Sequence, residues 1–191
     1  MKIIPGIVAL LEKKAAAGSI LARLYSNHYS RVIQKEIELA GITSGDRVLN
    51  VGCGGIPFTA ITVARLTGAR VYAIDCDREA VVAAKRCIKS FGMEKQVEAA
   101  CINGTAEIPF EYSVALVALQ AEPKKEILNN LALQAAQGAK LVFRKPRPEL
   151  AHQYDLLPEN PEPCALTSHN EATFNCSVLY TVIAGNMERA S

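Results

Sequence analysis

The residues best suited to chemistry form a glycine-rich turn directly after a short apolar run. Residues 48–51 are Val-Leu-Asn-Val, residues 52–55 are Gly-Cys-Gly-Gly, and Pro57 opens the next segment. Because glycine has no Cβ, such a turn adopts unusual φ angles and lets backbone N–H groups approach a ligand at the start of a helix. Asp75 ends the next apolar run, 21 residues after Gly54. This spacing predicts a carboxylate that accepts hydrogen bonds from both hydroxyls of a ribose.

Two ligands bind to turns of this kind, a dinucleotide and S-adenosylmethionine. A dinucleotide site has a third Gly or Ala where this chain has Pro57, and the turn contains no basic residue for a pyrophosphate. A Gly-x-Gly-Gly turn, with an acid at the end of the second strand, is common for S-adenosylmethionine. The alternative is that the glycines only form a tight turn and that Asp75 caps a helix. We predict S-adenosylmethionine as the cofactor.

Short β-branched runs alternate with amphipathic segments along the chain. This alternation predicts a parallel sheet with helices between its strands, and these elements must position the glycine turn. The expected strands are residues 47–51, 70–75, 97–102, 114–119, 140–144 and 176–183, with a short partner strand at 164–167. The expected helices are residues 57–66, 78–91 (capped by Asp77) and 123–137, after a helical stretch over 7–40 that Gly18 divides. We therefore predict a doubly wound, Rossmann-like α/β domain over residues 46–191, with a short N-terminal helical cap over residues 1–45.

Several short segments resemble one family. A Pro-x-Thr sequence follows the glycine turn at residues 57–59, and residues 121–124 read Ala-Glu-Pro-Lys. Arg144, Tyr154 and residues 175–179 (Asn-Cys-Ser-Val-Leu) add further matches. Across residues 46–183 the chain resembles the class I methyltransferase superfamily, and within it is most similar to archaeal nicotianamine-synthase-like proteins. The resemblance implies the class I methyltransferase fold and an activity that uses S-adenosylmethionine.

The chain departs from this family's pattern in three places. Gly55 stands where the family usually has a proline, and the family's large N-terminal helical domain is reduced here to residues 1–45. Residues 103–105 (Asn-Gly-Thr) stand where an acid commonly receives the adenine amino group, so we expect the Thr105 hydroxyl or a backbone carbonyl to accept instead. The expected cofactor contacts are Val51, Gly52, Cys53, Gly54, Pro57, Asp75, Cys76, Gly104, Thr105 and Leu119.

The same cofactor site supports more than one reaction. Attack on the methyl carbon of S-adenosylmethionine is methylation, whereas attack on the γ-carbon transfers a 3-amino-3-carboxypropyl group, and positioning decides between them. We expect methyl transfer to a small molecule, because most proteins with this fold transfer methyl groups. The resemblance implies the first alternative, aminocarboxypropyl transfer to an amine. The second alternative is a non-catalytic module that only binds S-adenosylmethionine.

An acceptor needs a base to remove its proton, and the second N-terminal helix offers one. Glu36 and Tyr29 lie seven residues apart, which places them on one face of a continuous helix. We predict these two as the catalytic residues, with Glu36 as the base provided that burial raises its pKa toward neutrality. The alternative is that Glu36 and Glu38 are solvated helix charges. His28 is a further candidate base.

Two histidines in the C-terminal loops, His152 and His169, could bind substrate or metal together with Glu149, Tyr154 and Cys164. A structural or solvent-facing role is the alternative, and we expect no metal. The six cysteines include no Cys-x-x-Cys pair, and a chain of 191 residues buries enough core without disulfides, so we expect reduced thiols.

Charge and hydropathy limit the partners. The 21 Lys and Arg residues nearly balance 19 Asp and Glu residues, so no electrostatic footprint for nucleic acid or an anionic membrane surface is present. No run approaches the ~20 apolar residues of a membrane span. The N-terminal apolar run is broken by Pro5 and Gly6 and does not fit a signal sequence. We expect a cytoplasmic protein with a small-molecule acceptor, no nucleic acid and no membrane as partners, and we leave a homodimer open.

Overall fold

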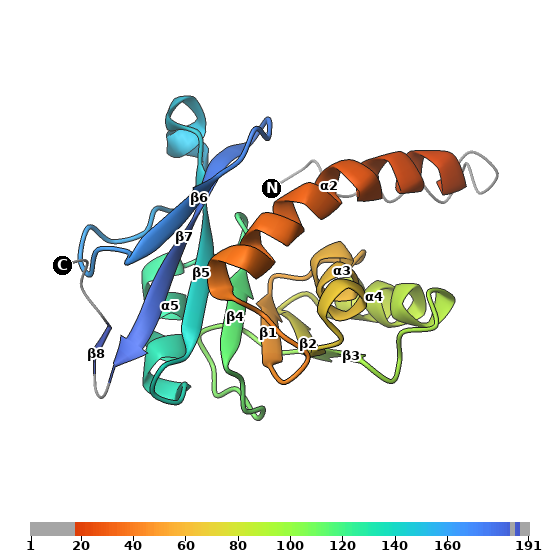
Figure 1. Ribbon diagram of the computed structural model, residues 1–191, viewed down its shortest axis with the longest axis horizontal. Helices are drawn as coiled ribbons and strands as arrows, with labels where there is room; N and C mark the ends of the chain where they lie inside the picture. Colours follow the sequence, from red (N-terminus) through yellow and green to blue (C-terminus); the bar gives the residue numbers. More distant parts are fainter. Residues whose placement is uncertain (1–17, 184–185, 188–191) are drawn as a thin grey trace.

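The computed structural model describes the backbone of residues 18–183 and 186–187, and the side chains of residues 29–183. Its strands are β1 (Arg47–Val51), β2 (Arg70–Asp75), β3 (Val97–Cys101), β4 (Val114–Val117), β5 (Lys140–Pro146), β6 (Ala165–Ser168), β7 (Phe174–Ile183) and β8 (Asn186–Met187). They form a sheet in the order β3-β2-β1-β4-β5-β7-β6, with β8 beside β7 (Figure 1). Neighbours from β3 to β5 are parallel, whereas β7 is antiparallel to β5 and β6. The predicted doubly wound sheet is confirmed.

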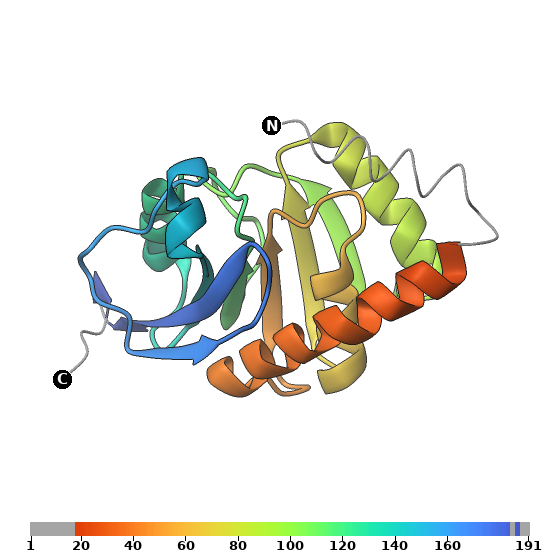
Figure 2. The same ribbon diagram turned by 90° about the horizontal axis from the view of Figure 1, so that it is seen from above.

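Helices cover both faces of this sheet. They are α2 (Gly18–Ala40), α3 (Phe58–Thr67), α4 (Arg78–Ser90) and α5 (Lys124–Gln134), with the 3-10 helix η1 (Pro148–Gln153). Strand side chains alternate between the two faces, so Val48 packs in one core cluster with α2, α3 and α4, and Leu49 packs in another with α5. Helix α2 lies along α3 on the first face (Figure 2). None of the described helices has the length and apolar content needed to cross a membrane.

Most element boundaries agree with the predicted ones to within a few residues, and the differences have local causes. Strand β4 ends at Val117, because a backbone bond from Ala121 N–H to Ala118 O (3.2 Å) closes a turn there. Strand β5 continues to Pro146, because β7 pairs along its length. The stretch after β5, which carries no predicted helix, contains η1, with Pro148 in its first turn. The helical stretch predicted before Gly18 lies outside the described residues.

The parallel strands bring their carboxyl ends to one edge of the sheet. Val51 at the end of β1 pairs with Ile74 on β2 and with Val117 on β4, and Asp75 pairs with Cys101 at the end of β3. The segments that follow these four strands therefore start side by side. In open α/β sheets this edge, at the point where the strand order reverses, is where ligands bind.

Candidate functional site

The glycine turn after β1 is held in place by the neighbouring strand. The backbone N–H groups of Gly52 and Cys53 both donate to Ile74 O, at 2.9 Å and 3.0 Å. Gly52 has φ 75° and Gly54 has φ 63°, values that favour glycine. A Cβ on Gly52 would also lie 3.2 Å from the Ala118 side chain, so the β4–α5 loop packs directly on the turn. The conformation of the turn and its close packing therefore require these glycines.

Asp75 meets this turn through its carboxylate. Its Oδ2 accepts a hydrogen bond from Gly54 N–H (2.8 Å), and its Oδ1 accepts one from Asp77 N–H (3.0 Å). A carboxylate accepts about four hydrogen bonds in total, so capacity for further donors remains on both oxygens. Asp77 in turn caps α4 by accepting from Glu79 N–H (2.8 Å), as predicted. The structure therefore brings together the two features that the sequence singled out, although ribose binding by Asp75 stays a prediction.

The other expected cofactor contacts gather at the same edge. Gly104 is buried against Val51, where a Cβ would come within 2.9 Å of Val51 Cγ1, so packing alone accounts for this glycine. The backbone N–H and the hydroxyl of Thr105 both donate to Asn103 Oδ1 at 3.0 Å, which leaves the hydroxyl oxygen able to accept. Leu119 is buried just beyond β4. Pro57 precedes the first residue of α3.

Two of these expected contacts are cysteines with different surroundings. Cys53 is buried, and burial together with the neighbouring Asp75 charge raises the pKa of its thiol to about 12. A thiol with so high a pKa carries almost no thiolate at neutral pH and is unreactive. Cys76 is exposed beside Asp75, and the Cys101 thiol lies 3.7 Å from its carbonyl oxygen.

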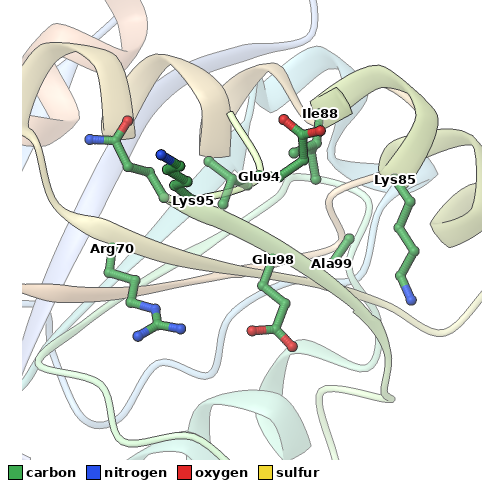
Figure 3. A pocket seen from close by; sticks show the side chains of 9 residues that line it. Arg70, Lys85, Ile88, Glu94, Lys95, Glu98 and Ala99 are labelled. Carbon is green, nitrogen blue, oxygen red and sulfur yellow. The ribbon is translucent and has the colours of Figure 1, made fainter. Parts of the chain in front are cut away.

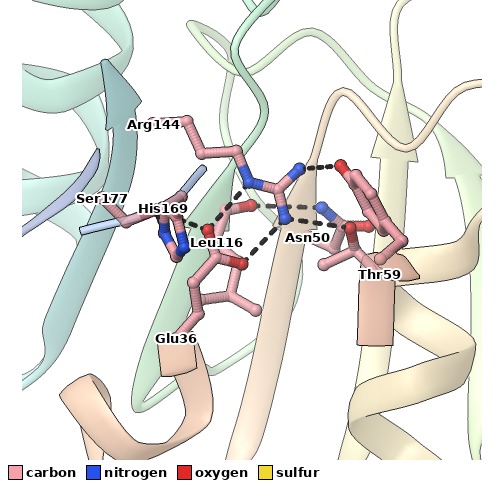
Figure 4. Close-up of polar contacts among 8 residues, drawn as sticks. Glu36, Asn50, Thr59, Leu116, Arg144, His169 and Ser177 are labelled. Atoms are coloured by element: carbon pink, nitrogen blue, oxygen red, sulfur yellow. Dashed lines mark hydrogen bonds and ion pairs between the residues drawn. The ribbon is translucent and has the colours of Figure 1, made fainter. Parts of the chain in front are cut away.

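A buried ion pair lies at this same edge, on the face that carries α2 and α3. Arg144 on β5 donates from Nε to Glu36 Oε1 (2.8 Å) and from Nη2 to Oε2 (2.7 Å). The exposed fractions of Glu36 and Arg144 are 1% and 5%. The Tyr29 and Phe174 rings flank the guanidinium, with their centroids 5.1 Å and 5.4 Å from Arg144 Cζ. Figure 4 shows the guanidinium facing the carboxylate.

Further polar groups extend the pair into what we call the Glu36–Arg144 network, which consists of Tyr29, Glu36, Thr59, Arg144, His169 and Ser177. Arg144 donates to the Tyr29 hydroxyl through Nη1 and to Thr59 Oγ1 (3.3 Å) through Nη2. Ser177 Oγ donates to Glu36 Oε1 (2.7 Å), and His169 Nε2 lies 2.9 Å from Ser177 Oγ. The network therefore joins side chains from five segments of the chain: helices α2 and α3, strands β5 and β7, and the loop after β6.

The predicted charge state of Glu36 needs correction. We expected burial to raise its pKa toward neutrality, and burial does act in that direction. The adjacent Arg144 charge, and the hydrogen bonds from Arg144 and Ser177, outweigh it and hold the pKa of Glu36 below its ordinary value. Glu36 is therefore ionised at neutral pH. The alternative of a solvated helix charge is also wrong for Glu36, whereas Glu38 is exposed and accepts a hydrogen bond from Gln34 (3.3 Å).

Strand register relates this network to the glycine turn. Val51 pairs with Val117, Val117 pairs with Phe143, and Arg144 follows Phe143. Arg144 thus stands level with the turn, two strands away across the carboxyl edge. Asn50 lies on β1, two residues before the turn, and its Nδ2 donates to Leu116 O on the intervening strand β4 (3.2 Å). Its buried Oδ1 has no hydrogen-bond partner among the described residues, so an unused acceptor lies in the same region.

The remaining candidate residues do not form a site of their own. His152 is exposed on η1, beside Gln153, while the Cys164 thiol donates to Leu179 O (3.3 Å). Tyr154 packs against the small cluster that contains Leu119. Within the described part of the chain, no group of three or more His, Cys, Asp or Glu side chains could hold a metal ion. The side chain of His28 lies outside the described residues.

A cavity of about 280 Å³ lies elsewhere, between α4 and the start of β3 (Figure 3). Arg70 and Val97 line it, and these are the first residues of β2 and β3. It therefore opens at the amino ends of the strands, away from the glycine turn. Its charged side chains are of both signs, Lys85 and Glu98 among them, so it offers no concentrated charge to bind a ligand.

Sequence reasoning did not find the contacts that Arg144, Ser177 and His169 make with one another and with Glu36. Arg144 and Glu36 are 108 residues apart, and Ser177 and Glu36 are 141 apart. The signal in the sequence is Arg144 itself, a charged residue directly after the apolar residues 141–143 and one of the positions that resemble the family. No spacing rule connects that residue to a helix so far upstream.

Comparisons with known proteins agree with this geometry. The family model described as "Nicotianamine synthase protein" matches residues 10–173. An L-histidine 2-aminobutanoyltransferase of Yersinia pestis is 33% identical over 123 residues, which are 63% of this chain and 45% of that protein. One of Pseudomonas aeruginosa is 30% identical over 114 residues, 59% of this chain and 43% of that protein. The chain spans about half the length of the curated relatives it matches.

Two solved structures show the same fold at lower sequence identity. A crystal structure of a glutamate-to-glutamine mutant of MtNAS in complex with S-adenosylmethionine has a TM-score of 0.78 and 20% identity, and the match covers 92% of this chain and 73% of that one. An RNA methyltransferase from Salinibacter ruber, in complex with S-adenosyl-L-homocysteine, has a TM-score of 0.66 and 20% identity, covering 80% of this chain and 91% of that one.

Proposed function

Since this chain belongs to the nicotianamine synthase family, we propose that it is an S-adenosylmethionine-dependent transferase that attaches the aminocarboxypropyl group of this donor to the amine of a small molecule. The curated relatives, named L-histidine 2-aminobutanoyltransferase, support this choice of transferred group. The near balance of charge supports a small acceptor in preference to nucleic acid. We also propose that the protein acts in the cytoplasm, and a homodimer stays open.

The observation that carries the proposal is the contact between Asp75 and the glycine turn. Asp75 Oδ2 accepts from Gly54 N–H at 2.8 Å, at the carboxyl edge of the sheet and next to the start of α3. This arrangement offers a carboxylate to a ribose at the edge of the sheet where ligands bind in such folds. The Glu36–Arg144 network stands level with it on the same edge, where an acceptor would have to approach.

The residues present fit an S-adenosylmethionine molecule. Among the described residues other than its two chain neighbours, none has a heavy atom within 4 Å of the position that a Cβ would occupy on Gly54, so the turn is open on that side. Asp75 keeps capacity for two more hydrogen bonds. The buried Asn50 Oδ1 lacks a donor, and an ammonium group on the donor or on the acceptor could supply one. When bound, the donor supplies an electrophilic γ-carbon, from which methylthioadenosine leaves with the electron pair of the broken C–S bond.

The chain's own residues then have to orient the acceptor and remove its proton. We propose that Tyr29, which is half-buried, contacts the acceptor nitrogen through its hydroxyl, while Arg144 holds that hydroxyl by a hydrogen bond. Glu36 is ionised and offsets the Arg144 charge, so an acceptor ammonium is not repelled from the site. Three of the roughly four acceptor positions of its carboxylate are taken by Arg144 and Ser177, which leaves one on Oε2 to accept a further hydrogen bond, while the lowered pKa makes Glu36 a weaker base than its burial alone suggests.

Identification of the nucleoside product tests the proposed reaction. The purified protein is incubated with S-adenosylmethionine and a panel of amines that begins with L-histidine, and the products are identified by mass spectrometry. We expect methylthioadenosine together with an acceptor that has gained the aminocarboxypropyl mass. S-adenosylhomocysteine would instead show methylation, and donor binding without either product would show a non-catalytic module.

Methyl transfer is kept as the second candidate because of one observation. The Salinibacter ruber methyltransferase is matched over 91% of its length, so a chain of this size accommodates a methyltransferase fold without a large additional domain. The two candidates share the cofactor site and differ only in which carbon faces the acceptor. The product assay above separates them.

A further inference from the structure

Ser177 and His169 continue the network from Glu36 Oε1, and Ser177 on β7 is the strand partner of Arg144 on β5. Ser177 on β7 is fully buried, and His169, which follows β6, is 9% exposed. The Ser177 hydroxyl oxygen lies 2.7 Å from Glu36 Oε1 and 2.9 Å from His169 Nε2. The imidazole packs edge-on against the Phe174 ring, at 5.3 Å between centroids, and the backbone N–H of His169 donates to Asn175 O (2.6 Å). Both side chains are thus fixed in position (Figure 4).

The direction of these hydrogen bonds follows from counting protons. Arg144 keeps Glu36 ionised, and an ionised carboxylate can only accept. The single proton of Ser177 must therefore point toward Glu36 Oε1, and the Ser177 oxygen must accept from its other neighbour. His169 Nε2 consequently carries a hydrogen, so the neutral imidazole has its proton on Nε2 and a lone pair on Nδ1.

We propose that Ser177 and His169 are positioning residues for the Glu36 carboxylate, and that the protein works with His169 neutral and protonated on Nε2; this rests on the proposed function. The Ser177 proton fixes Oε1 of Glu36 against Arg144 and leaves the free position on Oε2. Without this hydrogen bond the carboxylate would be free to rotate about its side-chain torsion. It would then no longer align with the Arg144 guanidinium, and Arg144 would no longer hold the Tyr29 hydroxyl in place. Misplacement of a reacting group by ~1 Å costs roughly 10²-fold in rate.

Burial favours the neutral form of His169, and charges of both signs surround it. Glu36 and Lys35 face it from α2, Arg144 from β5 and Glu171 from the loop before β7. Burial lowers the pKa of His169 below its ordinary value, and the Arg144 and Lys35 charges add to this, while Glu36 and Glu171 oppose it. Protonation of His169 would place a second cation near the Glu36 carboxylate, which is already paired with Arg144. We therefore expect the transfer rate to fall as the pH drops through the pKa of His169.

Four variants test this in the full chain with the product assay. Ser177→Ala removes the hydroxyl, His169→Leu removes the donor, and His169→Gln keeps an N–H donor that does not titrate. Exposed His152→Gln is the matched control. We expect Ser177→Ala and His169→Leu each to lower kcat about 10- to 100-fold, with KM for S-adenosylmethionine within about threefold. His169→Gln should stay within about threefold of the wild type at pH 8 and should lack the loss of rate at acid pH.

Nuclear magnetic resonance of the imidazole nitrogens tests the same inference without relying on activity. The wild-type protein, labelled with ¹⁵N-histidine, should show His169 with its proton on Nε2 and with a pKa below about 6.5; His169→Gln assigns the signal. An Nδ1-protonated ring, or kcat values of Ser177→Ala and His169→Leu within about threefold of the wild type, would overturn the inference. A wild type that gives no transfer product at all would instead overturn the proposed function.

Discussion

The Arg144 guanidinium and the Glu36 carboxylate form a two-point ion pair, with Nε 2.8 Å from Oε1 and Nη2 2.7 Å from Oε2. The pair joins α2 to β5 across 108 residues of chain, and both side chains are almost fully buried. It therefore fixes the N-terminal helix to the carboxyl edge of the sheet. Because the two charges cancel, it also puts Tyr29 beside a cation that does not repel an incoming ammonium.

Cofactor affinity should depend on Asp75. Asp75→Ala removes the carboxylate that would accept the ribose hydroxyls and also frees Gly54 N–H from its present partner. We expect the binding of S-adenosylmethionine to weaken by about 1.5–3 kcal/mol, the usual cost of losing hydrogen bonds to a charged group. Isothermal titration calorimetry measures this. Asp77→Ala, which removes only the cap of α4, is the control and should leave the affinity unchanged; equal affinity of Asp75→Ala and the wild type would contradict the assigned site.

The contact between the glycine turn and Asp75 could be predicted from sequence because its parts are local. The glycine turn and Asp75 each end a short apolar run, and parallel strands bring such ends together whatever the side chains. The acceptor side could not be predicted in the same way. Glu36, Arg144 and Ser177 come from three elements, and only the order of β5 and β7 in the sheet makes them meet.

The direction of the Glu36 pKa shift shows the same limit. Burial and a neighbouring cation move the pKa of a carboxyl group in opposite directions, and sequence periodicity predicts only the burial. Glu36 does lie on the buried face of its helix, seven residues after Tyr29, as its spacing suggested. Which effect prevails depends on Arg144, whose contact with the helix no local pattern reveals.

Removing one partner of the buried pair should cost more stability than removing both. Glu36→Gln leaves the Arg144 charge buried without its counter-charge, and we expect it to lower the free energy of unfolding by about 3–5 kcal/mol. Glu36→Leu/Arg144→Met removes both charges and should lose clearly less. Urea unfolding at pH 7 measures both. Arg47→Ala breaks the exposed pair with Glu111 and should change little; a Glu36→Gln protein as stable as this control would refute the prediction.

Stability should also decline at acid pH through the same pair. The folded-state pKa of Glu36 is lowered, so the unfolded chain takes up this proton at a higher pH than the folded protein. The contribution is complete above the unfolded pKa of about 4.3 and is lost as the pH falls from there toward the folded pKa. Urea unfolding from pH 7 to pH 3 should show a steeper decline for the wild type than for Glu36→Leu/Arg144→Met. Parallel curves for the two proteins would show that another group controls the acid transition.

Turnover should depend on the Tyr29 hydroxyl and not on its ring. Tyr29→Phe keeps an aromatic ring beside the guanidinium, 5.1 Å from Arg144 Cζ, but removes the hydroxyl that Arg144 holds. If this hydroxyl contacts the acceptor nitrogen, kcat should fall by roughly 10²-fold, the scale of a lost proton-transfer group, while S-adenosylmethionine affinity stays the same.

Tyr112→Phe is the matched control for this change. Tyr112 is a buried tyrosine on the other face of the sheet, and its hydroxyl donates to Leu131 O (2.9 Å). Its loss should cost about 1 kcal/mol of stability, as for one ordinary hydrogen bond, with no change in kcat. Rates are read from product formation, and stability from urea unfolding of the same preparations. If the two variants retained the same kcat, Tyr29 would be a packing residue, and the acceptor would have to meet the chain elsewhere along the carboxyl edge.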